Sequence, residues 1–293
     1  MKSTRLNVLK VALGAIVIAA ALFILAGCTT SSNTGTASST TASSTTSSSS
    51  ADKTITVAAS PTPHAEILAV AASVLAQQGY TLKVIEYTDY ILPNVATTTG
   101  EVDANYFQHQ PYLTNYNQKN GTNLVSVAKI HFEPLAIYAG KSSSLSSLKD
   151  GATVAVPNDA TNEARALLLL ADQGLITLKD PTNLTATIND IASNPKNLQF
   201  KELEAAAVPA ALPDVDIAVI NGNYALSAGL TAANQLAAES ATSLAAQTYA
   251  NILVTTPEKA NTEKIQALAG ALQSSAVRDF ITTHYNGAVI PVF

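Results

Sequence analysis

The side chains that most often carry catalysis are few in this sequence and are not grouped. The four histidines are His64, His109, His131 and His284, and none lies at metal-ligand spacing from another on a predicted helix. The sequence also has no Gly-x-Ser-x-Gly turn, no phosphate-binding loop and no His-Glu-x-x-His motif. These absences do not exclude an enzyme, and a hydrolase or lyase stays a remote alternative, but nothing in the sequence requires one, and we expect no metal and no cofactor.

Aromatic and hydrogen-bonding side chains gather where the first predicted strands end. Asp89 and Tyr90 follow one strand, and residues 105–112 read NYFQHQPY. If Phe107 and His109 lie on an extended segment, they point to the same face, because side chains alternate along a strand. That pair would give a pocket an apolar wall and a polar contact. The alternative is a packed core aromatic and a satisfied surface histidine.

A second candidate site is the turn NDATNEAR, residues 158–165, at the predicted start of a helix. Asn162 and Arg165 are three residues apart and therefore share a face of the first helical turn. Arginine is unfavourable there because the helix N-terminus carries a partial positive charge. A bound carboxylate would explain it, since the dipole, the free N–H groups and the guanidinium fork all favour an anion. The alternative is a salt bridge from Arg165 to Asp159 or Glu163.

Two further asparagines lie at the ends of predicted strands. Asn221 follows the strand that reads AVI, and Asn251 begins the strand that reads NILV. A carboxamide offers both a donor and an acceptor, which suits a ligand with an ammonium and a carboxylate group. The alternative for each is ordinary turn chemistry, and for Asn221 alone it would be favoured, because Asn-Gly is a common turn pair.

Strands and helices alternate after residue 53, which predicts an α/β fold with parallel sheets. Strands are predicted at 55–59, 81–87, 104–107, 153–156, 198–203, 216–220 and 251–255, with a long extended run at 125–138 that Pro134 can break. Helices are predicted at 64–78, 89–99 and 161–173, and one or two helices over 258–285. Ligands of such sheets bind beyond the C-terminal ends of the strands. A strand, proline, polar cap and helix recur from about residue 151, which suggests two similar lobes that enclose a cleft.

Residues 1–28 have the three parts of a lipoprotein signal. Basic residues precede the apolar run Val11–Leu25, which is shorter than the ~20 residues of a membrane-spanning helix. Leu-Ala-Gly then precedes Cys28, the only cysteine of the chain. We expect lipid on Cys28 to anchor the mature protein on the extracytoplasmic face of the cell membrane; the alternative is a plain anchor helix.

Residues 29–53 are dominated by serine and threonine and predict a flexible tether between the anchor and the folded part. Sixteen Lys and Arg against twenty-one Asp and Glu give a net charge of −5. The sequence shows no basic patch, so nucleic acid is not an expected partner.

Several segments together match one family pattern, in order from about residue 54 to residue 289. They read DYILPN, DANYFQHQPYL, HFEPLAIY, SLKDGATVAVPNDATNEARALLLLADQGLI, NPKNLQFKELEA, DVDIAVINGNYALSAGL, ANILV and YNGAV. The chain therefore resembles the methionine-binding lipoproteins of the NlpA type, which are substrate-binding proteins of ABC importers.

The resemblance implies a two-lobed periplasmic-binding-protein fold of type II, with the ligand cleft between lobe 1 (about 54–138 and 246–293) and lobe 2 (about 139–245). It implies that L-methionine is bound without chemistry and delivered to an ABC permease and its ATPase. The residues carried over by motif are Tyr90, Phe107 and His109 along one side of the pocket, Asn162 and Arg165 for the ligand carboxylate, and Asn221 and Asn251 for the amino-acid head group.

The chain departs from the family pattern in three places. The turn reads NEAR where the family has NQGR, so Ala164 replaces a glycine, and the end reads GAVIPVF rather than a Gly-Gly form ending in Trp. The segment 229–251 is rich in Ala and Ser and lacks the family's usual acidic and proline residues. The open alternatives are a binding protein for another amino acid or a short peptide, and an adhesin-like surface lipoprotein without a transport role.

Overall fold

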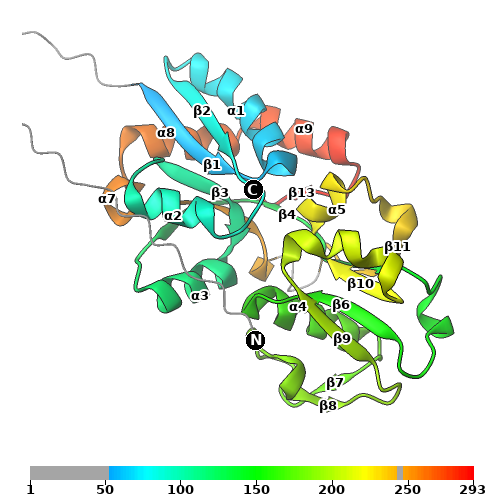
Figure 1. Cartoon of the computed structure of the whole chain (residues 1–293). Helices are drawn as coiled ribbons and strands as arrows, with labels where there is room; N and C mark the ends of the chain where they lie inside the picture. Colours follow the sequence, from blue (N-terminus) through cyan, green and yellow to red (C-terminus); the bar gives the residue numbers. More distant parts are fainter. Residues whose placement is uncertain (1–52, 243–246) are drawn as a thin grey trace, which may run out of the picture. The chain divides into compact units, whose positions relative to one another are not determined.

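The computed structural model describes residues 53–242 and 247–293 (Figure 1). The part from Ala51 to Phe293 is one compact unit. The expected signal, Cys28 and all but the last residue of the expected tether lie outside the described residues. In the described part of the chain, no helix is both long enough and apolar enough to cross a membrane.

Lobe 1 is built on a six-stranded sheet with the strand order β13-β4-β12-β3-β1-β2. Its strands are β1 (Thr54–Ala59), β2 (Thr81–Glu86), β3 (Ala104–His109), β4 (Val125–Phe132), β12 (Asn251–Thr255) and β13 (Ile290–Pro291). β1 pairs in parallel with β2 and β3, whereas β12 lies antiparallel between β3 and β4. The returning strand β12 thereby places Asn251 opposite both His109 and His131.

Lobe 2 is built on a five-stranded sheet with the strand order β11-β5-β10-β6-β9. Its strands are β5 (Ala136–Ala139), β6 (Thr153–Pro157), β9 (Gln199–Leu203), β10 (Ile217–Ile220) and β11 (Gln235–Ala238); β7 (Thr177–Leu178) and β8 (Ile191–Ser193) form a separate small sheet. β9, β6 and β10 are parallel, and β5 is antiparallel to β10. The parallel strands β6 and β10 are each followed by a helix that begins at the cleft, α4 and α5 (Figure 1).

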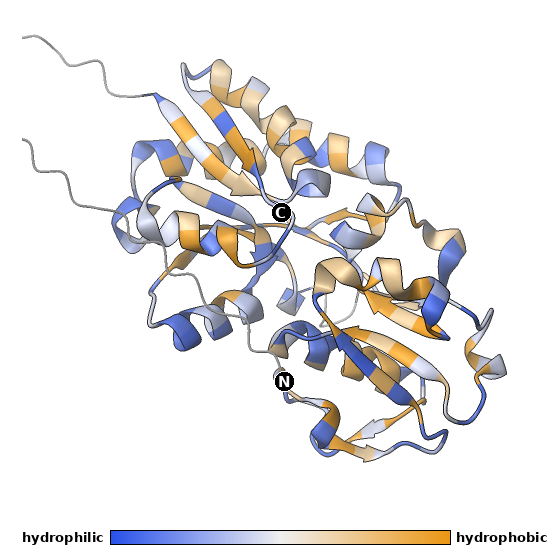
Figure 2. Ribbon diagram, viewed as in Figure 1, coloured by the Kyte–Doolittle hydropathy of each residue, from blue (hydrophilic) through white to orange (hydrophobic). Residues whose placement is uncertain are grey.

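Helices surround both sheets. Those of lobe 1 are α1 (Glu66–Ala76), α2 (Leu92–Thr99), α3 (Gln110–Asn120), α7 (Pro257–Ala260), α8 (Glu263–Leu272) and α9 (Ser275–Tyr285), and those of lobe 2 are α4 (Ala160–Asp172) and α5 (Gly222–Ser227). Single helical turns lie at Pro61–Ala65, Leu145–Ser147, Ile188–Asp190, Ala205–Ala207, Pro209–Asp214 and Ala232–Asn234. Hydrophobic residues line the strands and the inner faces of the helices (Figure 2).

Each lobe has its own hydrophobic core. In lobe 1, Ile55 and Val57 of β1 pack with residues of α1, α8 and α9. In lobe 2, Val154 and Val156 of β6 pack with Leu167 and other apolar residues of α4. Burial of a side chain of this size contributes about 1.5–3 kcal/mol, so each lobe is stabilised by its own interior and the cleft residues need not supply a core.

The α/β class and the two-lobed arrangement predicted from the sequence are confirmed, and the extended run 125–138 is divided at Pro134, the break that the sequence suggested. The run 125–138 is two strands in different sheets, β4 and β5, separated at Pro134. Proline has no N–H for a sheet hydrogen bond, and the chain crosses between the lobes there. The expected boundary between residues 138 and 139 therefore falls inside β5, and the first crossing is 133–135. The second crossing lies between β11 and β12, in a segment of which residues 243–246 are outside the described part.

One helix begins later than the sequence predicted, and another was not predicted at all. α2 begins at Leu92 rather than at Asp89, because the Asp89 carboxylate accepts the N–H groups of Ile91 (2.7 Å) and Leu92 (2.8 Å) before the helix. α3 was not predicted, because its sequence QPYLTNYNQKN is polar and Leu113 is its only buried residue.

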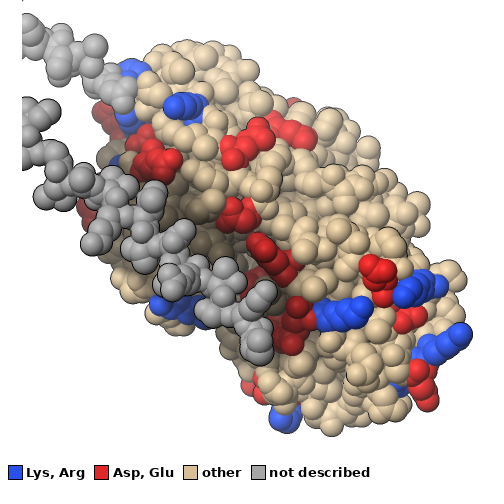
Figure 3. Space-filling model, in the orientation of Figure 1, with Lys and Arg blue, Asp and Glu red and all other residues tan. Residues whose placement is uncertain are grey.

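On the face drawn in Figure 3, Lys and Arg are interspersed with Asp and Glu.

Candidate binding site between the lobes

One pocket between the two lobes contains every pocket residue that the sequence singled out. Lobe 1 contributes Tyr90, Phe107, Gln108, His109, Tyr112 and Asn251, the first crossing contributes Glu133, and lobe 2 contributes Asn162, Arg165, Asn221, Gly222 and Asn223. The free volume at its centre is about 20 Å³, enough for about one water molecule. An amino acid can therefore enter only when the lobes separate or the lining side chains move.

Three aromatic rings form the apolar wall on the lobe 1 side. The ring centroids of Tyr90, Phe107 and Tyr112 lie 5.9 Å from one another. The Tyr112 hydroxyl donates to the Tyr90 carbonyl (2.8 Å), and the Tyr90 hydroxyl donates across the cleft to Asn223 Oδ1 (2.5 Å). Burial raises the pKa of Tyr90 and of Tyr112, so both stay neutral. The wall is thus apolar, and its ring edges suit a thioether, which contacts aromatic rings favourably.

His109 is a buried histidine whose two ring nitrogens are both used. Nδ1 accepts the N–H of Tyr112 (3.2 Å), so Nε2 carries the proton and donates to Asn162 Oδ1 (3.2 Å). Burial, and then the nearby charge of Arg165, lower the pKa of His109 to about 3. The expectation of a surface histidine is therefore wrong, although that of a satisfied one is right.

Arg165 is 4 % exposed and sits in the first turns of α4 with its guanidinium in the pocket. Its Nε and Nη2 donate to the two carboxylate oxygens of Glu239 (2.8 and 2.5 Å), and Nη2 also donates to the carbonyl of Glu133 (2.9 Å). Burial alone would lower the pKa of Arg165, but the ion pair with Glu239 raises it. The predicted alternative pairing with Asp159 or Glu163 is wrong, because those carboxylates bond to Asn162 and Ile188 instead.

Glu239 lies in the Ala/Ser-rich segment that the sequence analysis described as lacking acidic residues. Its Oε2 also accepts the N–H of Leu135 (2.8 Å), so it ties the two crossings together. Sequence reasoning missed it because it is 74 residues from Arg165 along the chain. The only indication of Glu239 in the sequence is that it is the one acidic residue between two apolar strands.

The asparagines of the pocket are held by different neighbours. Asn162 donates from Nδ2 to both oxygens of Asp159 (3.1 and 2.9 Å), and its Oδ1 accepts from Nδ2 of Asn221 (2.8 Å). Asn251 Oδ1 lies 2.9 Å from His64 Nε2. Both ends of the Asn162 amide thus bond to protein partners, and the contact with the ligand carboxylate that the resemblance implies stays a prediction.

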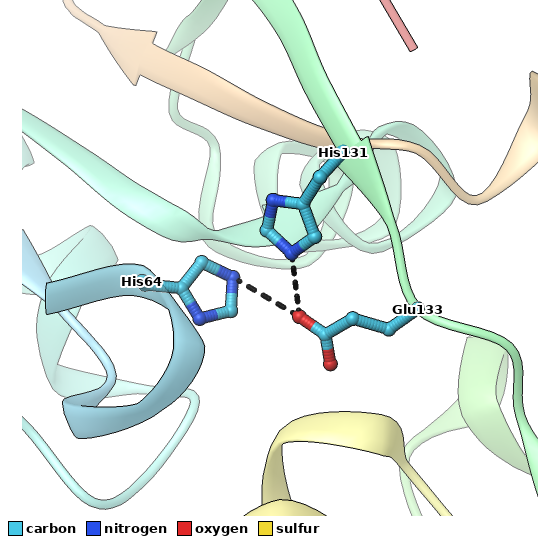
Figure 4. Close-up of side chains that lie close together, drawn as sticks. All are labelled: His64, His131 and Glu133. Atoms are coloured by element: carbon cyan, nitrogen blue, oxygen red, sulfur yellow. Dashed lines mark hydrogen bonds and ion pairs between the residues drawn. The ribbon is translucent and has the colours of Figure 1, made fainter. Parts of the chain in front are cut away.

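A buried cluster of His64, His131 and Glu133 lies beside Asn251 (Figure 4). Glu133 Oε1 accepts from His131 Nε2 (2.7 Å) and lies 3.5 Å from His64 Nε2. The Tyr106 hydroxyl donates to His131 Nδ1. Burial lowers the pKa of His64 to about 4 and that of His131 to about 3, and it raises the pKa of Glu133.

The three potential metal-ligand atoms of this cluster lie within 4.8 Å of one another. The sequence did not indicate the grouping, because it forms only when the turn after β1 meets the end of β4. Ligands at ~2.0–2.1 Å from a tetrahedral metal would lie farther apart than the 2.7 Å between His131 and Glu133. Hydrogen bonds place His131 between Tyr106 and Glu133 and join His64 Nε2 to Asn251, whereas the buried Nδ1 of His64 has no partner among the described residues.

Gly222 allows the crossing segment to approach α5 closely. A Cβ at this position would lie 2.7 Å from Glu133 Cβ and 2.8 Å from Glu133 Oε2, closer than real contacts allow. The Asn-Gly pair that favoured an ordinary turn thus has a second reason, since any larger residue would displace the Glu133 carboxylate from the pocket wall.

Comparisons with known proteins agree with this architecture. The family model of the NlpA lipoprotein matches residues 55–293. The methionine-binding lipoprotein MetQ of Bacillus subtilis is 41% identical over 244 residues, which is 82% of this chain and 88% of that protein. A crystal structure of a lipoprotein from Ruminococcus gnavus is 52% identical, has a TM-score of 0.81 and covers 82% of this chain and 100% of its own.

A nutrient-binding protein from Burkholderia cenocepacia, solved bound to methionine, is 42% identical. Its TM-score is 0.78, and the match covers 82% of this chain and 100% of that one. The family match extends over both lobes and over every residue of the pocket. This chain belongs to the NlpA lipoprotein family.

Proposed function

We propose that this protein is the substrate-binding subunit of an ABC importer, and that it captures methionine outside the cytoplasm and delivers it to the permease and its ATPase. It performs no chemistry on the ligand. The observation that carries the proposal is a pocket into which both lobes direct complementary groups: aromatic rings, a guanidinium, amides and a carboxylate.

The pocket suits the three parts of methionine. Arg165 offers a cation for the carboxylate. Asn221 Oδ1 is a buried acceptor without a partner among the described residues, and Glu133 adds a carboxylate on the same wall, so both suit an ammonium. The rings of Tyr90, Phe107 and Tyr112 suit an apolar thioether side chain.

The relatives support methionine as the ligand. One solved member of the family was bound to methionine, and the Bacillus subtilis relative is named a methionine-binding lipoprotein. The alternatives of another amino acid and of a short peptide are separated from methionine by mass spectrometry of whatever ligand remains bound through purification. A peptide in that sample would contradict the proposal.

Anchoring is part of the proposal. Cys28, at the end of the predicted signal, is the residue that would carry lipid, in keeping with the lipoprotein family to which the chain belongs. A tether then leaves the binding unit within reach of a permease and raises its effective concentration there. Metabolic labelling with a palmitate analogue should mark the full chain and not a Cys28→Ser variant. Equal labelling of both would show that Cys28 does not carry the lipid.

Calorimetric titration of the compact unit 51–293 with L-methionine tests the ligand. We expect saturable heat and a raised melting temperature, because a ligand that binds only the folded state stabilises it. Leucine, which has a side chain of similar size but no sulfur, is the matched control ligand. Absence of both heat and stabilisation with L-methionine would refute the substrate assignment.

A further inference from the structure

The carboxamide of Asn221 is only half used. Asn221 is 6 % exposed and caps the N-terminal end of α5 with its backbone, not with its side chain. Its Nδ2 donates to Asn162 Oδ1 (2.8 Å), whereas its Oδ1 is buried with no partner in the described part of the chain. A buried acceptor without a partner costs about 1–3 kcal/mol, so the pocket keeps this oxygen uncompensated in the absence of a ligand.

The orientation of that amide is determined by Asn162. If Asn162 turned its amide over, it would present Nδ2 to Asn221, and Asn221 would have to turn its own oxygen inward to accept. His109 gives the same constraint from lobe 1, because its Nδ1 accepts the N–H of Tyr112 and its protonated Nε2 must find an acceptor. Asn162 Oδ1 thus receives two donors, and Asn221 Oδ1 is directed away from it.

Asp159 determines the orientation of Asn162. Both Asp159 oxygens accept from Asn162 Nδ2 (3.1 and 2.9 Å), and a carboxylate has no proton to donate, so only the amide nitrogen of Asn162 can face it. Asp159 is itself fixed as the N-cap of α4, where it accepts the backbone N–H of Asn162 (3.0 Å) and the hydroxyl of Thr161 (3.0 Å). The helix dipole also favours a negative charge there.

Asp159, Asn162 and Asn221 all belong to lobe 2, so their hydrogen bonds do not depend on closure of the cleft. Asp159 does not line the pocket and acts only through Asn162. The relay Asp159–Asn162–Asn221 therefore presents Asn221 Oδ1 as an acceptor even before the cleft closes.

We propose that Asp159 is a positioning residue that makes this pocket select ligands with a free α-ammonium group. By orienting Asn162, it turns the oxygen of Asn221 toward the ligand and disfavours acids that lack the ammonium, because such acids leave this acceptor without a donor. The inference rests on the proposed function, since it assigns the ligand class of the same site: unmodified α-amino acids.

The test is an Asp159→Asn substitution in the unit 51–293. Asparagine is as good an N-cap as aspartate, so α4 is retained, but its amide can donate to Asn162. It therefore no longer fixes the orientation of the two downstream amides, for which only the constraint from His109 of lobe 1 remains. We expect the affinity for L-methionine to fall by about tenfold or more, the effect of one buried hydrogen bond to a charged group. The affinity for the carboxylic acid that lacks only the ammonium of methionine should stay unchanged or rise.

Two variants accompany this measurement. Thr161→Ala removes another hydrogen bond to Asp159 without touching Asn162, and it should leave both affinities as they are. Adding Asn221→Asp to Asp159→Asn should restore the preference for methionine, because a carboxylate at position 221 accepts in either orientation and can receive Nδ2 of a reversed Asn162.

The outcomes are distinct. An equal loss of affinity for methionine and for the acid without the ammonium would show Asp159 to be only a helix cap, and unchanged affinities for both would show it to be dispensable; either overturns the inference. If the parent protein binds a different α-amino acid and not methionine, the proposed function fails alone. The same ratio, measured with that amino acid and its deaminated form, then still decides the role of Asp159.

Discussion

The two lobes orient the same kind of side chain in opposite senses. In lobe 2, Asn221 gives its Nδ2 to Asn162 and keeps an oxygen without a partner. In lobe 1, Asn251 Oδ1 accepts from His64 Nε2, which leaves Nδ2 of Asn251 as the donor for other partners. Neither asparagine determines its own direction, so the polarity of the pocket is a property of the residues behind it.

The supports of the two asparagines differ in physical kind. The lobe 2 relay ends at Asp159, a carboxylate on a helix N-terminus, which can only accept. The lobe 1 support ends in the cluster of His64, His131 and Glu133, where the hydrogen-bond roles depend on which atoms carry protons. One asparagine of the site is therefore oriented by a fixed negative charge, and the other by which histidine nitrogens carry protons.

The largest effect is expected at Arg165, because its proposed contact with the ligand carboxylate depends on neither of the two supports. Arg165→Ala should abolish measurable methionine binding, a loss of about a hundredfold or more, because it removes the cation for the ligand carboxylate. It should also lower the free energy of unfolding by about 3–5 kcal/mol, since Glu239 is left buried without its partner. Titration calorimetry and urea denaturation measure the two effects.

The double variant Arg165→Ala with Glu239→Gln separates these effects. Removing the unpaired charge should recover much of the stability but none of the binding. Methionine binding by Arg165→Ala with unchanged affinity would mean that the ligand carboxylate is held elsewhere.

The second effect is a loss of stability in acid that originates mainly in lobe 1. His64, His131 and His109 have pKa values lowered to about 4, about 3 and about 3 from 6.5, so all are neutral in the folded protein. The unfolded chain binds protons on them below pH 6.5. Their stabilisation is therefore complete above that value and is lost as the pH falls toward 4 and then 3.

The slope should approach about 1.4 kcal/mol per pH unit for each histidine, or about 4 for three. Glu133 acts in the opposite sense, because its raised pKa favours the folded state at low pH and offsets part of the loss. Urea denaturation at several pH values measures the slope. His131→Gln should reduce it; a slope that is independent of all three buried histidines contradicts the account.

A smaller effect is expected when the lobe 1 support is removed directly. His64→Leu takes away the donor to Asn251 Oδ1 and should weaken methionine binding by about tenfold, the worth of about 1–1.5 kcal/mol. Unlike Asp159→Asn, it should weaken binding of methionine and of the acid without the ammonium alike, because Asn251 loses a defined direction rather than an acceptor. A selective loss for methionine alone would erase the contrast between the lobes.

The smallest effect concerns a direct bond between the lobes. Tyr90→Phe removes the hydroxyl that donates to Asn223 across the cleft but keeps the ring in the aromatic wall. The affinity should fall by a factor of about three to ten, for a loss of about 0.5–1.5 kcal/mol. Tyr112→Phe is the matched control, since its hydroxyl bonds within lobe 1; equal effects of the two would mean that closure does not depend on the bond.

The sequence was sufficient for the α/β class, for the two lobes and for seven of the twelve residues that line the pocket, because these follow from local patterns and from motifs. Phe107 and His109 could be placed on one face from strand alternation alone. What it could not supply were partners distant along the chain: Glu239 for Arg165, and His64 for Asn251. Such pairs depend on how the sheets come together, which no local spacing encodes.

The run 125–138 shows the same limit. Both halves are apolar and extended, so periodicity could not show that they belong to different sheets, although Pro134 indicated the break between them. The prediction that Asn162 meets the ligand carboxylate also remained a matter of motif. The hydrogen bonds around it assign it to positioning, because both sides of its amide already have protein partners.

The bonds of Arg165 to both crossing segments have a mechanical consequence. Its guanidinium holds the carbonyl of Glu133 on one crossing and the carboxylate of Glu239 on the other. Arg165 thus links a residue of each connection to α4 of lobe 2. If the lobes separate to admit a ligand, we expect a group bound to Arg165 to lie near the axis of that rotation and to move less than the aromatic wall of Tyr90, Phe107 and Tyr112.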